Sequence, residues 1–426
     1  MQPVGGEDGC KDQGSPPATG HRVRDNGAPS HSTPPFPSPK IPSSQQQQMH
    51  EHGDEDEQQQ QQQPAASLPE DALVEILSRV PYRSLRRFKC VSKPWLALCS
   101  ATDIRRRSPQ TLSGLFHFGI DGLKFHNLSG RGPPMVDPSL PFLRESYKRV
   151  TVEQCCTSLL LCQCGKSCSE EYDYVVCNPA TERWVVLPPL VLPDGEPHNL
   201  DPSNIFLGFD TAAPSRFMVF VPMSGYCNGF AAVAIYSSDS GRWTFVQSHW
   251  GSRTFLVGNP ECVFLNGIMH LATHHSSVAM VDTEGKAWRK IEIPGIMPNR
   301  YDNAIASIGQ SQGRLHAWRI DYHHDCQLYV WVLEDYDSGK WSLKHTVNVL
   351  ELFRRHCRKD VESYTMFAIH PECDLIFLTD GEEMTMSYDM DNQNVHVICT
   401  SEEFLGGLPY TPCFAEWPSL KVSGAS

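Results

Sequence analysis

Long apolar runs are missing from this sequence. No stretch approaches the roughly 18 consecutive apolar residues that a membrane-spanning helix needs, and the N-terminus is too polar for a secretory signal. These absences predict a chain of the cytoplasm or the nucleus with no membrane partner. Its 16 cysteines are therefore expected to be reduced thiols and not a disulfide framework.

Positive charge is also scarce. Lys and Arg number 36 against 49 Asp and Glu, which gives a net charge of −13. Because affinity for nucleic acid depends on Lys and Arg contacts with phosphates, this balance argues against a general nucleic-acid-binding protein.

The usual signatures of catalysis and metal binding are absent or incomplete. The chain has no GxSxG elbow, no phosphate-binding glycine-rich loop and no CxxC pair. Cys162, Cys164 and Cys168 are spaced like zinc ligands, but no second Cys/His pair follows them. His270 and His274 are four residues apart, yet the glutamate of HExxH is missing and the context is typical of a strand. We therefore expect no catalytic residue, no cofactor and no metal.

Residues 1–66 have a composition that does not favour folding. They contain ten prolines, no Trp or Tyr, and glutamine runs at Gln45–Gln48 and Gln58–Gln63. Such a segment buries too little apolar surface to offset its ordering entropy, on the order of 1–2 kcal/mol per residue for the backbone. The prediction is a disordered tail.

Residues 67–107 have the pattern of three short helices. The first begins at Pro69 with acidic residues in its first turn, and Ser84 and Ser92 are expected to cap the second and third. Apolar residues recur on the first helix at i, i+3, i+4 and i+7, which predicts one apolar stripe: Leu73, Ile76, Leu77 and Val80.

Residues 113–418 instead show short runs of β-branched and aromatic residues, separated by Gly, Pro, Asp and Asn. Examples are Cys262–Leu265 and Leu328–Leu333, and Leu115–Phe118 and Leu123–Asn127 are candidates for the first strands. This punctuation predicts an antiparallel β-domain. Only Val349–Cys357 has the pattern of a short helix.

A turn followed by tryptophan recurs in this β-rich region. The copies end at Trp184, Trp243, Trp288 and Trp341, and a fifth turn ends at Val395; neighbouring copies are 45 to 59 residues apart. A period near 50 residues is typical of one four-stranded propeller blade, which leaves room for about six blades. A two-sheet sandwich would explain the strands but not the period.

The segment from Leu68-Pro69-Glu70 to Val91-Ser92-Lys93-Pro94-Trp95 resembles an F-box. It has the opening Leu-Pro, the paired Ile76-Leu77 on the first helix and the closing Val-Ser-Lys-x-Trp of that family. The remainder is similar to the plant F-box-associated domain, with a Cys-Asn-Pro-Ala-Thr box at 177–181 and Gly-Phe-Asp at 208–210. Thr157-Ser158 departs from that family, which usually has Asn-Gly there.

The resemblance implies a mainly β protein in which a small three-helix F-box precedes a six-bladed β-propeller. It implies a non-catalytic adaptor of a Skp–cullin–F-box (SCF) ubiquitin ligase, with the F-box docking a Skp-family adaptor and, through it, a cullin. The β-domain would bind an unidentified protein target through loops such as Pro193–Ser203 or Asn299–Asn303. The expected adaptor-binding residues are Leu68, Pro69, Leu73, Ile76, Leu77, Leu85, Val91 and Trp95.

Two alternatives stay open at the level of sequence. One is a protein-binding module that works apart from a ligase, and the other is a propeller enzyme such as a hydrolase. The F-box segment is also basic within an acidic chain, which would steer an acidic partner towards it.

Overall fold

The computed structural model describes residues 68–80, 82–101, 104, 111–128, 136–166, 171–211, 213–224, 230–250, 254, 262–274, 276–294, 306–322, 326–354 and 364–414. The expected tail at 1–66 and the predicted loop Asn299–Asn303 lie outside these residues. No helix among the described residues combines the length and the apolar character that crossing a membrane requires.

Three short helices occupy the segment that resembles an F-box: α1 (Glu70–Leu77), α2 (Tyr82–Phe88) and α3 (Lys93–Ser100). Acidic side chains stand in the first turn of α1, where they complement the positive end of the helix dipole. The Ser92 hydroxyl caps α3 by accepting a hydrogen bond from the backbone N–H of Trp95 at 3.4 Å. The expected cap at Ser84 is wrong, because α2 begins two residues before it.

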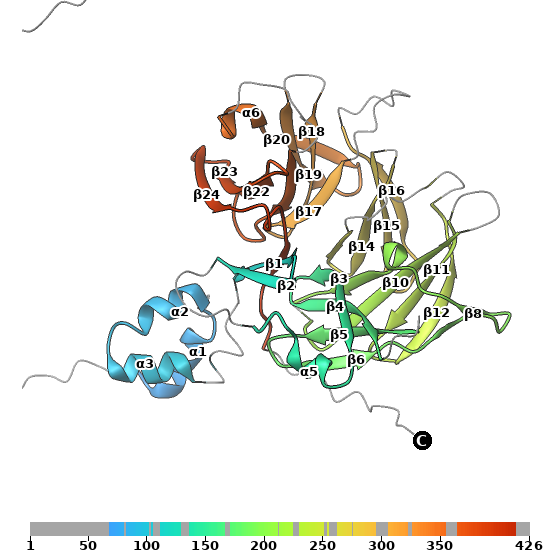
Figure 1. Ribbon diagram of the computed structural model, residues 1–426, viewed down its shortest axis with the longest axis horizontal. Helices are drawn as coiled ribbons and strands as arrows, with labels where there is room; N and C mark the ends of the chain where they lie inside the picture. The colour runs from blue at the N-terminus through green and yellow to red at the C-terminus, as the bar shows by residue number, and fades with distance from the viewer. Residues whose placement is uncertain are drawn as a thin grey trace, which may run out of the picture. The chain divides into compact units, whose positions relative to one another are not determined.

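The rest of the described chain is a six-bladed β-propeller whose sheets follow one another around a centre (Figure 1). The first blade has three strands, β2-β1-β25, and each of the other five has four. The bounds of the first two blades are β1 (Gly114–Gly119), β2 (Gly122–Asn127) and β25 (Leu408–Tyr410), then β3 (Arg149–Cys156), β4 (Leu159–Gly165), β5 (Tyr172–Asn178) and β6 (Arg183–Val186).

The remaining blades repeat this antiparallel meander. The third has β9 (Phe206–Phe209), β10 (Phe217–Ser224), β11 (Phe230–Ser237) and β12 (Arg242–Gln247), and the fourth has β13 (Cys262–Leu265), β14 (Ile268–Ala272), β15 (Ser277–Asp282) and β16 (Trp288–Glu292). The fifth has β17 (Ser307–Ser311), β18 (Arg314–Asp321), β19 (Gln327–Asp335) and β20 (Lys340–Asn348), and the sixth has β21 (Thr365–Ile369), β22 (Leu375–Thr379), β23 (Met384–Asp389) and β24 (Asn394–Thr400). The two-sheet sandwich is therefore wrong.

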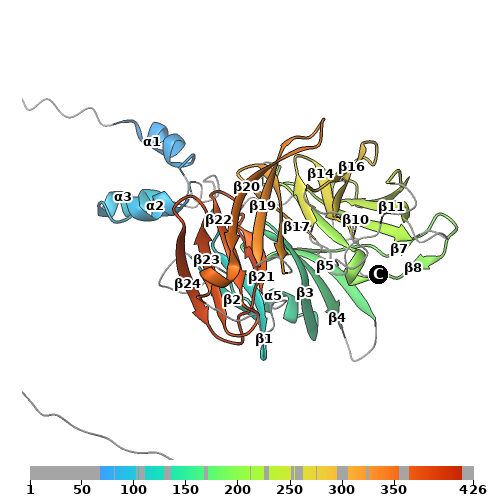
Figure 2. The same ribbon diagram turned by 90° about the horizontal axis from the view of Figure 1, so that it is seen from above.

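Short elements connect the blades. Helix α5 (Pro141–Arg144) precedes the second blade, and α6 (Val349–Leu352) follows the fifth, covering the start of the helix predicted at Val349–Cys357. Between the second and third blades, β7 (Leu190–Val191) and β8 (Pro197–His198) form a small hairpin that projects beyond the blades in both views (Figures 1 and 2).

The ring closes through strands from opposite ends of the domain. β25 pairs antiparallel with β1, with Gly114 opposite Tyr410 and Phe116 opposite Leu408. The Tyr410 side chain is fully buried and meets the Phe116 ring edge-on, with 5.1 Å between centroids. The last strand thus completes the first blade. No local sequence pattern predicts this long-range pairing.

Apolar clusters fill the spaces between consecutive blades. Leu159 and Leu161 of the second blade, for example, pack with Leu207 and Phe209 of the third. Equivalent clusters lie at every other junction, and Leu115 packs with Phe377 where the sixth blade meets the first. Because each sheet is covered on both faces, its middle strands are mostly buried, as in β4, β15 and β22.

The turn-then-tryptophan copies hold equivalent places in five blades. Each turn joins the third strand to the outer strand and contains one residue of positive φ (Glu182, Gly241, Gly285, Gly339 and Gln393, φ 54° to 68°). Each copy ends on the outer strand, where its last residue pairs with the third strand: Cys177–Trp184, Tyr236–Trp243, Val281–Trp288, Leu333–Trp341 and Tyr388–Val395.

All four tryptophans pack against the cluster shared with the preceding blade. Two of them also use the indole N–H: that of Trp243 donates to the Pro188 carbonyl at 2.9 Å, and that of Trp288 to the Gly285 carbonyl at 2.7 Å. Each ring is nevertheless only partly buried, since it lies at the outer rim of its blade.

Candidate partner-binding surfaces

The helical segment divides its apolar side chains between a small core and an exposed surface. Leu77 and Leu85 are buried, together with Cys99 and Ile104. Leu68, Ile76, Val91 and Leu96 instead expose 54%, 50%, 66% and 48% of their surface. Four large apolar side chains that are each about half exposed or more are unusual for a segment of this size, and they indicate a surface that a partner covers.

The structure thus separates the eight residues predicted to bind an adaptor. Leu68, Pro69, Ile76 and Val91 are exposed. Leu77 and Leu85 belong to the core, and their contact with an adaptor stays a prediction. Leu73 and Trp95 are partly buried. The helical spacing predicts which residues share the apolar stripe. It does not show which of them are buried in the core and which are left exposed to a partner.

Trp95 links the core to the surface. Its ring meets Phe88 edge-on, with 5.8 Å between centroids, and it packs against the buried cluster. Leu96, its neighbour on α3, is absent from the predicted set although it is exposed. The only sequence signal for Leu96 is an apolar residue next to the tryptophan on a capped helix.

Basic side chains accompany these apolar ones. Arg79 is exposed and forms an i, i+4 ion pair with Glu75 at 2.7 Å, which stabilises the end of α1 only slightly at such exposure. Arg87 and Lys93 are exposed as well. The side chains of Arg83 and Arg86, and residues Arg105–Arg107, lie outside the described part of the chain.

A cavity of about 280 Å³ lies at the centre of the propeller. Its wall is formed by the inner strands β3, β13, β17, β21 and β25, with Trp318 of β18 behind them. Aromatic and aliphatic groups make up much of it, and Glu153, Gln154, Thr157, Gln310 and Thr411 contribute polar groups. A space of this size suits a side chain or a small molecule and not a folded domain.

Two thiols of this wall, those of Cys155 and Cys156, are poor nucleophiles. Burial raises the pKa of Cys155 well above its ordinary value and that of Cys156 to about 12. Since the thiolate is the reactive form, neither side chain is activated for covalent chemistry. Among the described residues, no three His, Cys, Asp or Glu side chains gather as metal ligands.

The residues considered as zinc ligands have structural roles. Cys162 and Cys164 are buried between the first two blades, and the Cys162 sulfur lies 3.9 Å from that of Cys177. His270 is fully buried on β14, where its Nδ1 contacts the Val263 carbonyl at 3.0 Å. Cys168 lies outside the described residues.

Two exposed loops of the propeller are candidates for binding a target: the β1–β2 turn and the segment around β8. The β1–β2 hairpin exposes 55% of Phe118 and 88% of Ile120 at its tip. The predicted target loop Pro193–Ser203 includes the β7–β8 turn and β8, and Asp201 caps the short 3-10 helix Pro202–Asn204 by accepting from the Ser203 N–H at 2.9 Å. Whether either feature binds a target stays a prediction.

Comparison with known families assigns both parts of the chain. Residues 66–107 match the family model of the F-box domain. Residues 136–417, about two thirds of the chain, match the model described as "F-box protein At3g26010-like, beta-propeller".

Curated relatives agree with these matches. The chain is 26% identical to F-box protein At5g49610 of Arabidopsis thaliana over 67% of this chain and 80% of that protein. It is 24% identical to F-box protein At5g07610 of the same plant, over 66% of this chain and 70% of that one. The putative F-box/kelch-repeat protein At1g15680, also from Arabidopsis thaliana, is 24% identical over 84% of this chain and 89% of its own length.

Proposed function

Because the chain belongs to the plant F-box proteins that carry a C-terminal β-propeller, we propose that it is the substrate-recruiting subunit of an SCF-type ubiquitin ligase. The observation that carries this proposal is the pairing, in one chain, of an F-box with exposed apolar side chains and a propeller. The F-box would bind a Skp-family adaptor and, through it, a cullin. The propeller would bind the target protein.

The mechanism is proximity, and it needs no bond-making residue in this chain. Binding the target on one domain and the ligase on the other raises the effective concentration of target lysines near the ubiquitin carrier. A subunit of this kind would work in the cytoplasm or the nucleus, and the free thiols of the described cysteines are compatible with either compartment.

A substitution at an exposed apolar side chain of the F-box can test adaptor binding without disturbing the fold. Ile76 contributes little to the F-box core because half of its surface is exposed, whereas its neighbour Leu77 is 2% exposed. Ile76→Asp should therefore weaken binding of a Skp-family adaptor tenfold or more, about 1.4 kcal/mol, with little change in melting temperature. Calorimetry with the purified adaptor measures the affinity.

Two control variants separate docking from folding. Leu343→Asp places the same charge on a propeller side chain of similar exposure, 53%, and should leave adaptor affinity unchanged. Leu77→Ala should lower the stability of the F-box because it opens a cavity. Equal adaptor affinity for Ile76→Asp and the unmodified protein would contradict the proposed docking surface, and failure of a cullin to co-purify would contradict the ligase role.

A further inference from the structure

Glu153 holds an unusual position in the wall of the central cavity. The register between β3 and β4 shifts between Val152 and Gln154, so Glu153 is the extra residue of a β-bulge. Bulges commonly re-aim a side chain next to a functional site. Here the bulge places an acidic residue in the lining of the cavity.

The neighbouring Gln154 is fully engaged in holding two blades together. Its amide donates to the Ile205 carbonyl at 2.6 Å, and its oxygen accepts from the Leu207 backbone N–H at 2.9 Å. These bonds fix the backbone of β3 at the bulge. The position of Glu153 is therefore rigid, which favours selective binding over loose attraction.

Glu153 is the one charged residue among the described residues that line the cavity. Within the same part of the chain, no Lys, Arg or His lies within ion-pair distance of its carboxylate. Burial raises the pKa of this carboxyl above its ordinary value, so its negative charge is costly where it stands. A cationic ligand would offset that cost.

The other groups of the wall suit a cation on an apolar stem. Phe264 and Phe367 belong to the lining, and each ring also packs into the adjoining blade junction; aromatic rings attract ammonium and guanidinium groups and pack against methylene chains. Gln310 and Thr157 add hydrogen-bonding groups. Lysine and arginine side chains have this combination of apolar stem and charged end.

Charge over the whole domain has the matching sign. Residues 113–418 contain 36 acidic and 22 basic residues, a net charge of −14, whereas residues 67–107 contain four acidic and nine basic ones. A basic target would be steered to the propeller and away from the F-box.

We propose that the central cavity is a specificity pocket that takes a lysine or arginine side chain of the target protein, with Glu153 as its counter-ion. This proposal rests on the proposed function, because it names the chemical class of the target. It makes the ligase selective for a basic recognition segment.

A displayed library of random short peptides, selected on the full-length protein bound to its Skp-family adaptor, tests the pocket. Selected peptides should share a Lys or Arg at one fixed position. The best of them, made synthetically, should bind Glu153→Gln at least tenfold more weakly, since a charge-assisted hydrogen bond would be lost. Replacing its fixed basic residue by norleucine should weaken binding to the unmodified protein equally, and should weaken binding to Glu153→Gln no further.

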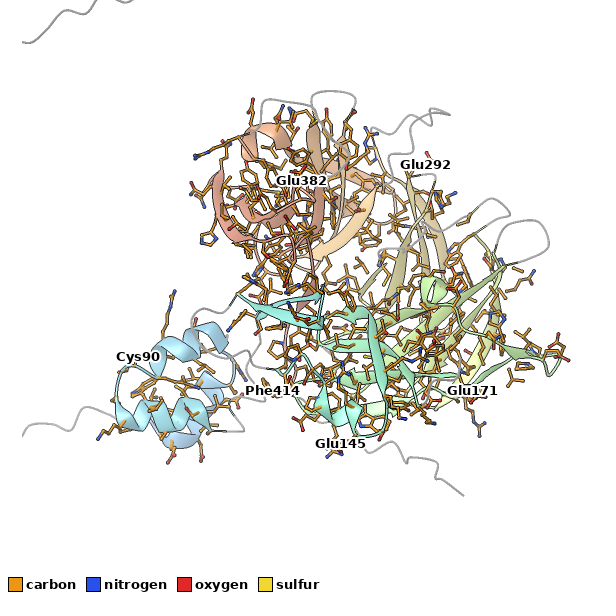
Figure 3. All side chains as sticks on the ribbon, in the orientation of Figure 1. Cys90, Glu145, Glu171, Glu292, Glu382 and Phe414 are labelled. Atoms are coloured by element: carbon orange, nitrogen blue, oxygen red, sulfur yellow. The ribbon has the colours of Figure 1, made fainter. Side chains whose placement is uncertain are left out.

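Glu292→Gln is the matched control, because Glu292 is exposed at the end of the outer strand β16 (Figure 3). It removes the same charge outside the cavity and should change peptide affinity less than twofold. Equal weakening by both variants would reduce the effect to general electrostatic attraction and overturn the pocket. Melting temperatures of both variants show that the fold is intact.

Further results of the peptide selection would overturn the specificity pocket. Selected peptides without a fixed basic residue would overturn the proposal, and so would a selection that enriches nothing. Agmatine, a free guanidinium compound, should bind far more weakly than the peptide; equal affinity would assign the cavity to small cations instead of a protein. Cullin co-purification with the unmodified protein is scored separately, so that failure of the ligase role leaves the peptide result interpretable.

Discussion

His270 is a buried titratable residue between two blades. It has no exposed surface, and its Nε2 lies 3.3 Å from the Tyr336 hydroxyl while Nδ1 faces the Val263 carbonyl. A neutral imidazole satisfies both contacts if Nδ1–H donates to the carbonyl and the tyrosine donates to Nε2. Desolvation by burial lowers the pKa of this imidazole to about 4.

This shift predicts an acid-sensitive fold. Between pH 6.5 and about 4 the unfolded chain binds a proton at this position and the folded chain does not, so stability falls as the pH is lowered. The loss of folding free energy from this residue amounts to about 3 kcal/mol when the pH has fallen to about 4. Thermal melts of His270→Gln should start from a lower stability at pH 7 and lose less of it on acidification than the unmodified protein.

His396 provides the control for that measurement. It is exposed on the outer strand β24, so His396→Gln should leave the pH dependence of the melting temperature unchanged. Burial also lowers the pKa of His316, so protonation of that residue likewise destabilises the fold at low pH. The melting temperature of His270→Gln should therefore depend less steeply on pH, but the dependence should not vanish. An unaltered slope in His270→Gln would contradict the assigned cause.

At the scale of elements, the hairpin turns explain why the propeller could be predicted from the sequence. A left-handed residue must precede the outer strand, and Gly241, Gly285 and Gly339 adopt that conformation without strain. The turns that contain these glycines, each followed by a tryptophan, therefore recur and reveal the period. The β3–β4 turn departs from the family pattern, yet Thr157 adopts the left-handed φ of 57° and the hairpin forms.

Long-range features could not be predicted in this way. The pairing of β25 with β1 joins residues about 300 positions apart, and nothing in Pro409 or Tyr410 indicates its partner. The bulge at Glu153 is similarly invisible, because an extra residue in a strand leaves no local signature. On the F-box, periodicity places Ile76 and Leu77 on one stripe although only Leu77 is buried.

The repeated tryptophan offers a test of the blade junctions. Trp243→Ala should lower the free energy of unfolding by about 3 kcal/mol, at the lower end for large aromatic residues because the ring is partly exposed. It also leaves the Pro188 carbonyl without its indole partner. Val395→Ala, at the equivalent position of the sixth blade but 41% exposed, should cost less than about 0.5 kcal/mol. Chemical denaturation compares the two, and similar losses would contradict the contribution assigned to the Trp243 ring at the blade junction.

At the scale of the whole molecule, ring closure couples the two ends of the propeller. Each blade buries its faces only against its neighbours, so an open ring would expose the clusters at the junctions of the first blade with the second and sixth. Tyr410 is central to one of these, packing against Phe116 and Phe125. Its hydroxyl is buried and makes no well-formed hydrogen bond among the described residues, because the nearby Ala180 backbone N–H donates to the Asn178 side chain at 3.0 Å.

The Tyr410 hydroxyl and ring therefore have opposite effects. Tyr410→Phe removes a polar group that is costly to bury, and it should leave stability unchanged or raise it by about 1 kcal/mol. Tyr410→Ala removes the ring and should cost about 3–5 kcal/mol. Ending the chain after Ser401, which deletes β25, should abolish the cooperative unfolding transition of the propeller, because five blades and an incomplete first one leave both junctions open.

The F-box should respond differently to these changes. Its buried cluster consists of its own residues, Leu77, Leu85, Cys99 and Ile104, and includes none from the propeller. Adaptor affinity should therefore survive in Tyr410→Ala and in the chain that ends after Ser401, while target binding is lost. Calorimetry with the adaptor and near-ultraviolet circular dichroism of the propeller aromatics measure the two parts separately. Loss of adaptor binding in step with the propeller signal would show that the F-box depends on the closed ring, and retention of the signal without β25 would show that closure is dispensable.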